Sequence, residues 1–208
     1  MKSTELHRHL REDLAPWFKS QEFKRAPRAQ LGWHRGRLLV WFQCDQWGWD
    51  RYAGGSFFVN FQTSDRPEPW AGPNERLQHF LEPDDLEAAR ALQNIVIAKL
   101  SPPPREHVEA LRAAFARTAE DPDGLVDALL AAFRPVVEPY RAHQDFSLRY
   151  FDREDVRGWS AFLLRLLPRI VDGRLSGDAV PRAEGEAAPP DPARSPEPTP
   201  RPRDSGGE

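Results

Sequence analysis

Apolar residues recur at helical spacing near both ends of the chain. One apolar side chain per turn predicts an amphipathic helix over residues 3–19. A wide apolar stripe predicts a last helix that is capped by Asp152 and ends at Gly173. Residues 83–100 and two shorter stretches after them show the same periodicity, and a short strand at 146–151 precedes the last helix. The second half of the chain is therefore predicted to be mainly helical.

Strand patterns follow the first helix directly. The segments 37–46 and 56–64 are the strongest, and a weaker strand at 23–34 is interrupted by Pro27. Both alternating sets of residues in 37–46 are apolar up to Gln43, which predicts a central strand with two covered faces. Strands followed by helices are typical of an α+β fold. We therefore predict an α+β protein with a small, mostly antiparallel β-sheet covered by amphipathic helices.

Charge and proline content divide the chain into two parts. Of 29 basic and 32 acidic residues, which give a net charge of −3, the segment 176–208 holds four arginines and seven acids. This segment has eight prolines and no aromatic residue, so it is predicted to be a disordered, acidic, proline-rich C-terminal tail. Residues 1–175 keep 25 basic and 25 acidic residues and are predicted to form a single α+β domain. The net charge of the whole chain is therefore no guide to its partners.

Several classes of protein are excluded or disfavoured by what the sequence lacks. A single cysteine, Cys44, excludes an internal disulfide, and no apolar run is long enough for a membrane span. The polar N-terminal segment does not resemble a secretion signal, so the predicted location is the cytoplasm. The histidines lack metal-ligand spacing, and no GxSxG or phosphate-binding glycine loop is present. We expect no cofactor, and catalysis is the less favoured interpretation.

Aromatic residues gather between residues 31 and 70, where five of the seven tryptophans lie. The segment 47–55 (WGWDRYAGG) joins the two strongest strands and is rich in the residue types that dominate binding energy. It is either a binding loop or an aromatic plug that closes the open end of the sheet. Its candidate binding residues are Trp47, Trp49, Asp50, Arg51 and Tyr52.

Two glutamines stand out because they interrupt apolar strands. Gln43 and Gln62 each need hydrogen-bond partners there. The favoured interpretation is a structural polar pair across the sheet, and the alternative is a polar contact to a ligand. Cys44 lies beside Gln43 and is interpreted as a small core residue rather than a nucleophile.

A local basic stretch runs from Lys19 to Arg37 and includes Arg35. It carries six basic residues against Glu22 alone. The stretch could face an anion, or it could be the solvated side of an edge strand. With an exposed tryptophan as a stacking platform, it would suit single-stranded nucleic acid.

Several short motifs resemble the bacterial domain-of-unknown-function family numbered 4304. They lie mainly in the first 65 residues, and the segment Arg149–Phe151 has a similar place before the last helix. The chain departs from that family by the inserted segment 47–55. The resemblance implies a small bacterial α+β domain and implies no activity. The motifs are Trp17-Phe18, Lys24-Arg25, Trp33-His34-Arg35, Phe42-Gln43 and Phe57-Phe58-Val59-Asn60.

These patterns favour a non-catalytic module that binds another protein, or another ligand, through an aromatic loop beside the sheet. The expected partner is another bacterial protein, and nucleic acid is less expected because residues 1–175 are neutral overall. The alternatives are single-stranded nucleic-acid binding through the basic stretch 19–37 and an enzyme of unknown reaction.

Overall fold

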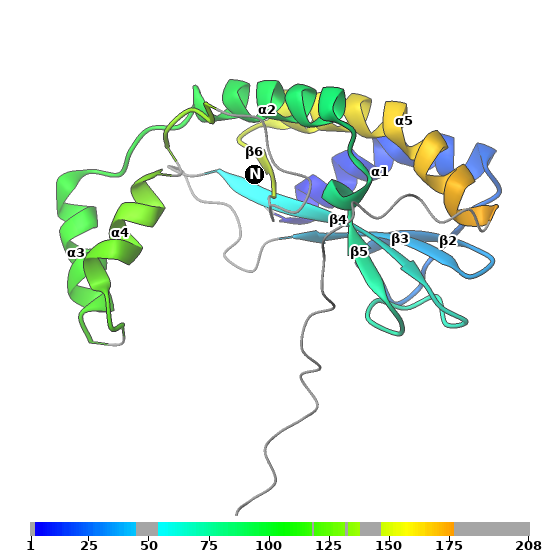
Figure 1. The fold of residues 1–208 in the computed structure, drawn as a ribbon, viewed down its shortest axis with the longest axis horizontal. Helices are drawn as coiled ribbons and strands as arrows, with labels where there is room; N and C mark the ends of the chain where they lie inside the picture. Colours follow the sequence, from blue (N-terminus) through cyan, green and yellow to red (C-terminus); the bar gives the residue numbers. More distant parts are fainter. Residues whose placement is uncertain (1–2, 45–53, 118, 132, 138–146, 177–208) are drawn as a thin grey trace, which may run out of the picture.

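A layer of helices packs on one side of an antiparallel sheet in the computed structural model, which describes residues 3–44, 54–117, 119–131, 133–137 and 147–176 (Figure 1). The sheet has the strand order β1-β2-β3-β4-β5, and β6 pairs with the same edge of β4 as β5 does. The elements are α1 (Ser3–Ser20), β1 (Lys24–Arg25), β2 (Leu31–Arg35), β3 (Leu38–Cys44), β4 (Gly55–Thr63), β5 (Asn74–Arg76), the 3-10 helix η1 (Leu77–Phe80), α2 (Pro83–Ile97), α3 (Arg105–Phe115), α4 (Pro122–Ala131), β6 (Leu148–Tyr150) and α5 (Arg153–Leu175).

The core lies between the sheet and helices α1 and α5. One set of alternating residues from each central strand, such as Val40 and Val59, packs against the apolar stripes of these helices. Trp159 on α5 is fully buried, and its indole nitrogen donates to the Arg149 carbonyl of β6. This burial fixes which face of every strand points toward the helices, because neighbouring side chains in a strand point to opposite faces.

The predicted α+β fold with a mostly antiparallel sheet and covering helices is confirmed. The cap of the last helix is also confirmed, since the Asp152 side chain accepts hydrogen bonds from the backbone of Glu154 and Asp155. The predicted end at Gly173 is wrong. Helix α5 continues to Leu175, because glycine is tolerated inside a helix whose neighbours pack well. Of the predicted tail, 176–208, residues 177–208 lie outside the described residues.

The other face of the sheet, which we call the distal face, points away from α1 and α5. Strand register places Trp41 opposite Asn60 on this face, and Asn60 opposite Arg76 of β5. No helix of the described residues packs on it. Instead, the β1–β2 turn and residues 64–73, which connect β4 to β5 and which we call the 64–73 loop, lie against it.

The predicted two-sided burial of the central strand is therefore confirmed. Leu38 and Val40 of β3 face the helices, while Leu39 and Trp41 pack with alanines of the β1–β2 turn. Gly32 of β2 permits this close packing. A Cβ atom there would lie 2.9 Å from the Cβ of Ala29 and 3.0 Å from that of Trp41.

Candidate functional site

Residues Trp47, Trp49, Asp50, Arg51 and Tyr52 lie outside the described part of the chain. The binding loop and the aromatic plug both stay predictions. The described residues that flank this segment, Cys44 and Gly54, stand at the adjacent ends of β3 and β4.

The other predicted site residues, Gln43, Gln62 and Arg35, are described, and the structure does not bring them together. Gln43 pairs with Phe58, and Gln62 pairs with Leu39, so the predicted polar pair between the two glutamines is wrong. The register that separates them is set by the length of the β3–β4 connection, which sequence periodicity does not reveal.

Arg35 belongs to a different part of the sheet. It ends β2 opposite Leu38, on the side of the helices and at the far end of β3 from Gln43. The basic stretch 19–37 likewise does not form one surface, because neighbours such as Lys24 and Arg25 point to opposite faces of β1.

The distal face instead gathers buried polar atoms that lack partners. The indole nitrogen of Trp41 and the Oε1 atom of Gln43 have no hydrogen-bond partner among the described residues. The same is true of Asn60 Nδ2, Gln62 Oε1 and Asn74 Oδ1. Each unmatched buried polar group costs about 1–3 kcal/mol, so such a cluster needs a reason. Two of these atoms, on Trp41 and Gln43, belong to residues that line a groove on the same face.

A groove of about 460 Å³ opens beside these atoms. Trp41 and Gln43 line it from β3, and Trp70 lines it from the 64–73 loop. The rings of Trp41 and Trp70 meet edge to face at 4.8 Å between centroids. The remaining lining residues are Arg28, Gln30, Phe42, Cys44, Glu68 and Pro69.

Trp70 is held in an unusual conformation. Its φ angle is 66°, in the left-handed region that bulky residues avoid, and 60% of its surface is exposed. Backbone strain of this kind costs on the order of 1–3 kcal/mol and is typical of ligand-binding sites. Trp70 therefore combines a strained backbone with a large apolar ring that is more than half exposed.

The 64–73 loop is fixed to the sheet through polar contacts. The amide nitrogen of the buried Gln62 donates to the Glu68 carbonyl at 2.8 Å. The Glu68 carboxylate pairs with Arg28 of the β1–β2 turn, and Arg66 approaches it to 3.9 Å. Gln62 is thus a residue that positions the loop, and this is its observed partner in place of Gln43.

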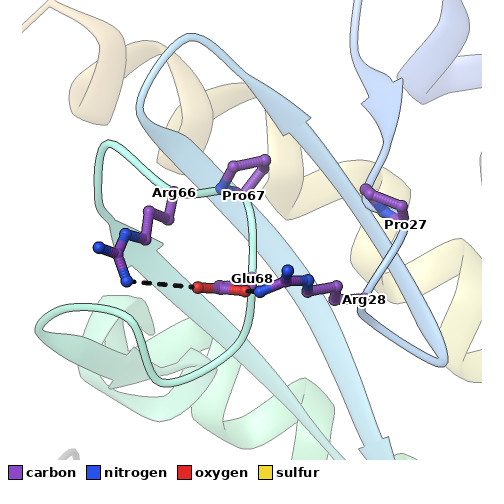
Figure 2. Close-up of a pocket in the computed structure, with 5 residues that line it drawn as sticks. All are labelled: Pro27, Arg28, Arg66, Pro67 and Glu68. Atoms are coloured by element: carbon purple, nitrogen blue, oxygen red, sulfur yellow. Dashed lines mark hydrogen bonds and ion pairs between the residues drawn. The ribbon is translucent and has the colours of Figure 1, made fainter.

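A second hollow, which we call the arginine pocket, shares Arg28 and Glu68 with the groove. It has a volume of about 360 Å³ and is walled by Pro27 and Pro67. Figure 2 shows the Glu68 carboxylate between the guanidinium groups of Arg28 and Arg66. These two arginine side chains are 75% and 80% exposed. Two cations around one carboxylate leave the rim of the groove positive.

Cys44 has a neighbour that the sequence did not reveal. Its sulfur lies 3.0 Å from Nε2 of His7 on α1. Burial, together with the charge of Arg11, lowers the pKa of His7 below its ordinary value of 6.5. Cys44 also packs against the core, as predicted, while it lines one end of the groove.

Sequence analysis selected Gln43, which lines the groove, and did not select Trp70, which lines it as well. Trp70 was counted among the clustered tryptophans, but the segment 47–55 drew attention because it has more aromatics and glycines. The available signal was a tryptophan inside a loop with three prolines, where no helical or strand periodicity gives the ring a place in the core.

No family model matches the chain, and no curated protein or solved structure matches it. The resemblance to the family numbered 4304 therefore stays a prediction. Within the described residues, no helix combines the length and the apolar character needed to cross a bilayer.

Proposed function

We propose that the protein is a non-catalytic binding module and that the groove beside Trp70 is its binding site. The observation that carries the proposal is the strained, exposed Trp70 above a groove lined by Trp41 and Gln43, which bear unpartnered buried polar atoms. Aromatic rings supply contact area, and a few fixed polar groups supply orientation, which is the usual composition of a ligand site.

The proposal keeps the predicted mode of binding and assigns it to another loop. The sequence favours an aromatic loop beside the sheet, and the 64–73 loop has that position among the described residues. A protein partner stays a prediction that concerns the segment 47–55.

The ionisable groups of the groove support binding rather than catalysis. Arg28 and Glu68 neutralise each other as an ion pair. The neighbouring thiol of Cys44 faces a histidine whose lowered pKa disfavours the imidazolium form that would stabilise a thiolate.

A fragment screen by NMR tests the site without assuming a ligand class. We expect planar heteroaromatic fragments to shift the indole resonances of Trp41 and Trp70 and the side-chain amide of Gln43. The matched control is Ile95→Ala, which removes an exposed apolar side chain on α2, whereas Trp70→Ala removes one at the groove. Fragments that bind equally well to wild type and Trp70→Ala, or only at other surfaces, would contradict the proposal.

A further inference from the structure

The chemistry of the site allows the ligand class to be named. Resting on the proposed function, we propose that the ligand is a nucleobase linked to a phosphate. In this proposal the base stacks on Trp70 in the groove, and the phosphate binds Arg28 and Arg66 in the arginine pocket. A nucleotide and a single-stranded nucleic acid share this chemistry.

The groove offers a stacking surface for a base. Trp70 is more than half exposed, and Trp41 meets it edge to face, which fixes the orientation of the pair. Every base has a π-face, so an exposed, fixed indole ring is a suitable platform. A groove volume of about 460 Å³ is of the size of a small-molecule site.

Amide groups lie where the edge of a stacked base would be recognised. Gln43 is half-buried and lines the groove together with Gln30, and its buried Oε1 atom has no hydrogen-bond partner among the described residues. The buried indole nitrogen of Trp41, on the same strand, likewise has no partner among the described residues. Bases present both donors and acceptors on their edges, and glutamine can match either kind.

Charge favours an anionic group next to the base. Glu68 has an arginine on each side, and each guanidinium carries more N–H donors than one carboxylate uses. The strand positions of the distal face that the structure describes include Lys24 and Arg76 and contain no Asp or Glu. A neutral sugar would stack on Trp70 equally well, but it would leave this excess of arginine unused.

Binding experiments on the full chain test the proposal. The probes are fluorescently labelled oligothymidylate and oligoadenylate of about ten nucleotides, a length that spans the usual site of a single-strand binder. A second arm titrates AMP, CMP, GMP and UMP separately and follows the Trp70 indole resonance. Saturable binding in the first arm alone identifies single strands as the ligand, and binding in both arms identifies the nucleotide unit. Either result supports the proposal.

Variants test whether the base binds in the groove and the phosphate binds in the arginine pocket. Trp70→Gly removes the ring and relieves the positive φ angle, so the loop should stay folded while affinity falls about ten-fold or more. Trp70→Phe should restore part of the affinity. The affinity for single strands falls with salt concentration, and a plot of log affinity against log salt concentration has a negative slope. The double variant Arg28→Gln/Arg66→Gln should make this slope shallower by about 1.4, because it removes two phosphate contacts. Arg105→Gln, which removes an exposed charge from α3, is the matched control and should change little.

Two results would overturn the proposal. The first is no saturable binding of oligonucleotides or mononucleotides at millimolar concentration. The second is binding that Trp70→Gly leaves unchanged. If glucose or maltose binds with the same dependence on Trp70 and nucleotides do not, the nucleobase assignment fails. Fragment binding at the groove would then still support the proposal that the protein is a binding module. The experiments therefore distinguish failure of the nucleobase proposal from failure of the proposed function.

Discussion

At the scale of single residues, the contact between Cys44 and His7 decides how reactive the thiol is. A histidine activates a cysteine when it is protonated, because the imidazolium stabilises the thiolate. Burial and the charge of Arg11 lower the pKa of His7, so its ring is mainly neutral at pH 7 and shares a hydrogen bond with the thiol. The pair is therefore a hydrogen-bonded structural contact between α1 and the end of β3.

We predict that iodoacetamide alkylates Cys44 no faster than free cysteine at pH 7. The rate is followed by mass spectrometry of the intact chain, which has a single cysteine. The variant His7→Ala, which removes the neutral imidazole beside the thiol, should not slow the alkylation of Cys44. A wild-type rate more than about ten-fold above that of free cysteine would indicate a thiolate and would favour an enzyme.

At the scale of elements, Lys99 joins the end of α2 to the start of α5. Its Nζ atom lies 2.6 Å from Asp155 and 3.0 Å from Asp152, and the Asp155 side chain is almost fully buried. Burial alone would lower the pKa of Lys99, but the hydrogen bonds to Asp155 and Asp152 outweigh it and raise the pKa above 10.5. For Asp152, burial alone would raise the pKa, and the hydrogen bond from Lys99 reverses this and holds it below 3.8.

We predict that Lys99→Met destabilises the fold by about 1–3 kcal/mol, because it leaves a buried carboxylate without its cation. Urea denaturation at pH 7 measures the change. Lys19→Met is the matched control, since Lys19 is exposed in the last turn of α1, and it should cost less than about 0.5 kcal/mol. Equal losses of unfolding free energy in Lys99→Met and Lys19→Met would show that the ion pairs of Lys99 do not stabilise the fold.

The same pair predicts a pH dependence with a defined sign. The raised pKa of Lys99 means that its contribution is complete below pH 10.5 and is lost as the pH rises further. The lowered pKa of Asp152 means that its contribution is present above pH 3.8 and is lost as the pH falls further. The stability difference between wild type and Lys99→Met should therefore be flat between these limits and shrink outside them.

Sequence patterns predicted those helices and strands that are determined by residues close together in the sequence. Asp152 caps α5 through its own side chain, and the apolar residues of β3 are buried on both faces, so both elements could be predicted from nearby residues. Strand β5 was missed because Asn74–Arg76 is short and polar and exists only through its pairing with β4. The position of Trp70 beside Gln43 was not predicted for the same reason. Trp70 and Gln43 meet at the groove only after the 64–73 loop folds back over the sheet.

At the scale of the whole molecule, the end of α5 contacts the edge of the sheet. Arg174 pairs with Glu75 of β5, and its guanidinium lies 4.9 Å from the Phe80 ring centroid. Leu175 follows as the last helical residue. Arg174 thus ties the end of the helix to the edge of the sheet, although the sequence predicted that the helix ends at Gly173.

We predict that truncation after Ser176 changes the free energy of unfolding by less than about 0.5 kcal/mol. Truncation after Gly173 should cost about 1–2 kcal/mol, because it removes the ion pair and the cation–π contact of Arg174. Thermal and urea denaturation of both truncated chains measure the difference. The variant Arg174→Ala in the full chain should reproduce most of the second loss. Equal stability of the two truncated chains would show that these contacts are not stabilising.

The way in which the 64–73 loop is attached has a consequence for how this protein can diversify. Its described attachments are the Gln62 amide, two ion pairs (Arg28–Glu68 and Arg37–Asp65), a backbone hydrogen bond from Ser64 to Arg37 and one ring contact, and the hydrophobic core between sheet and helices does not depend on them. The ten residues 64–73 can therefore be replaced together by another loop, provided that the Gln62 side chain still finds a backbone carbonyl to which it can donate. Such a scaffold could acquire new specificities by loop replacement while its folding stability is preserved.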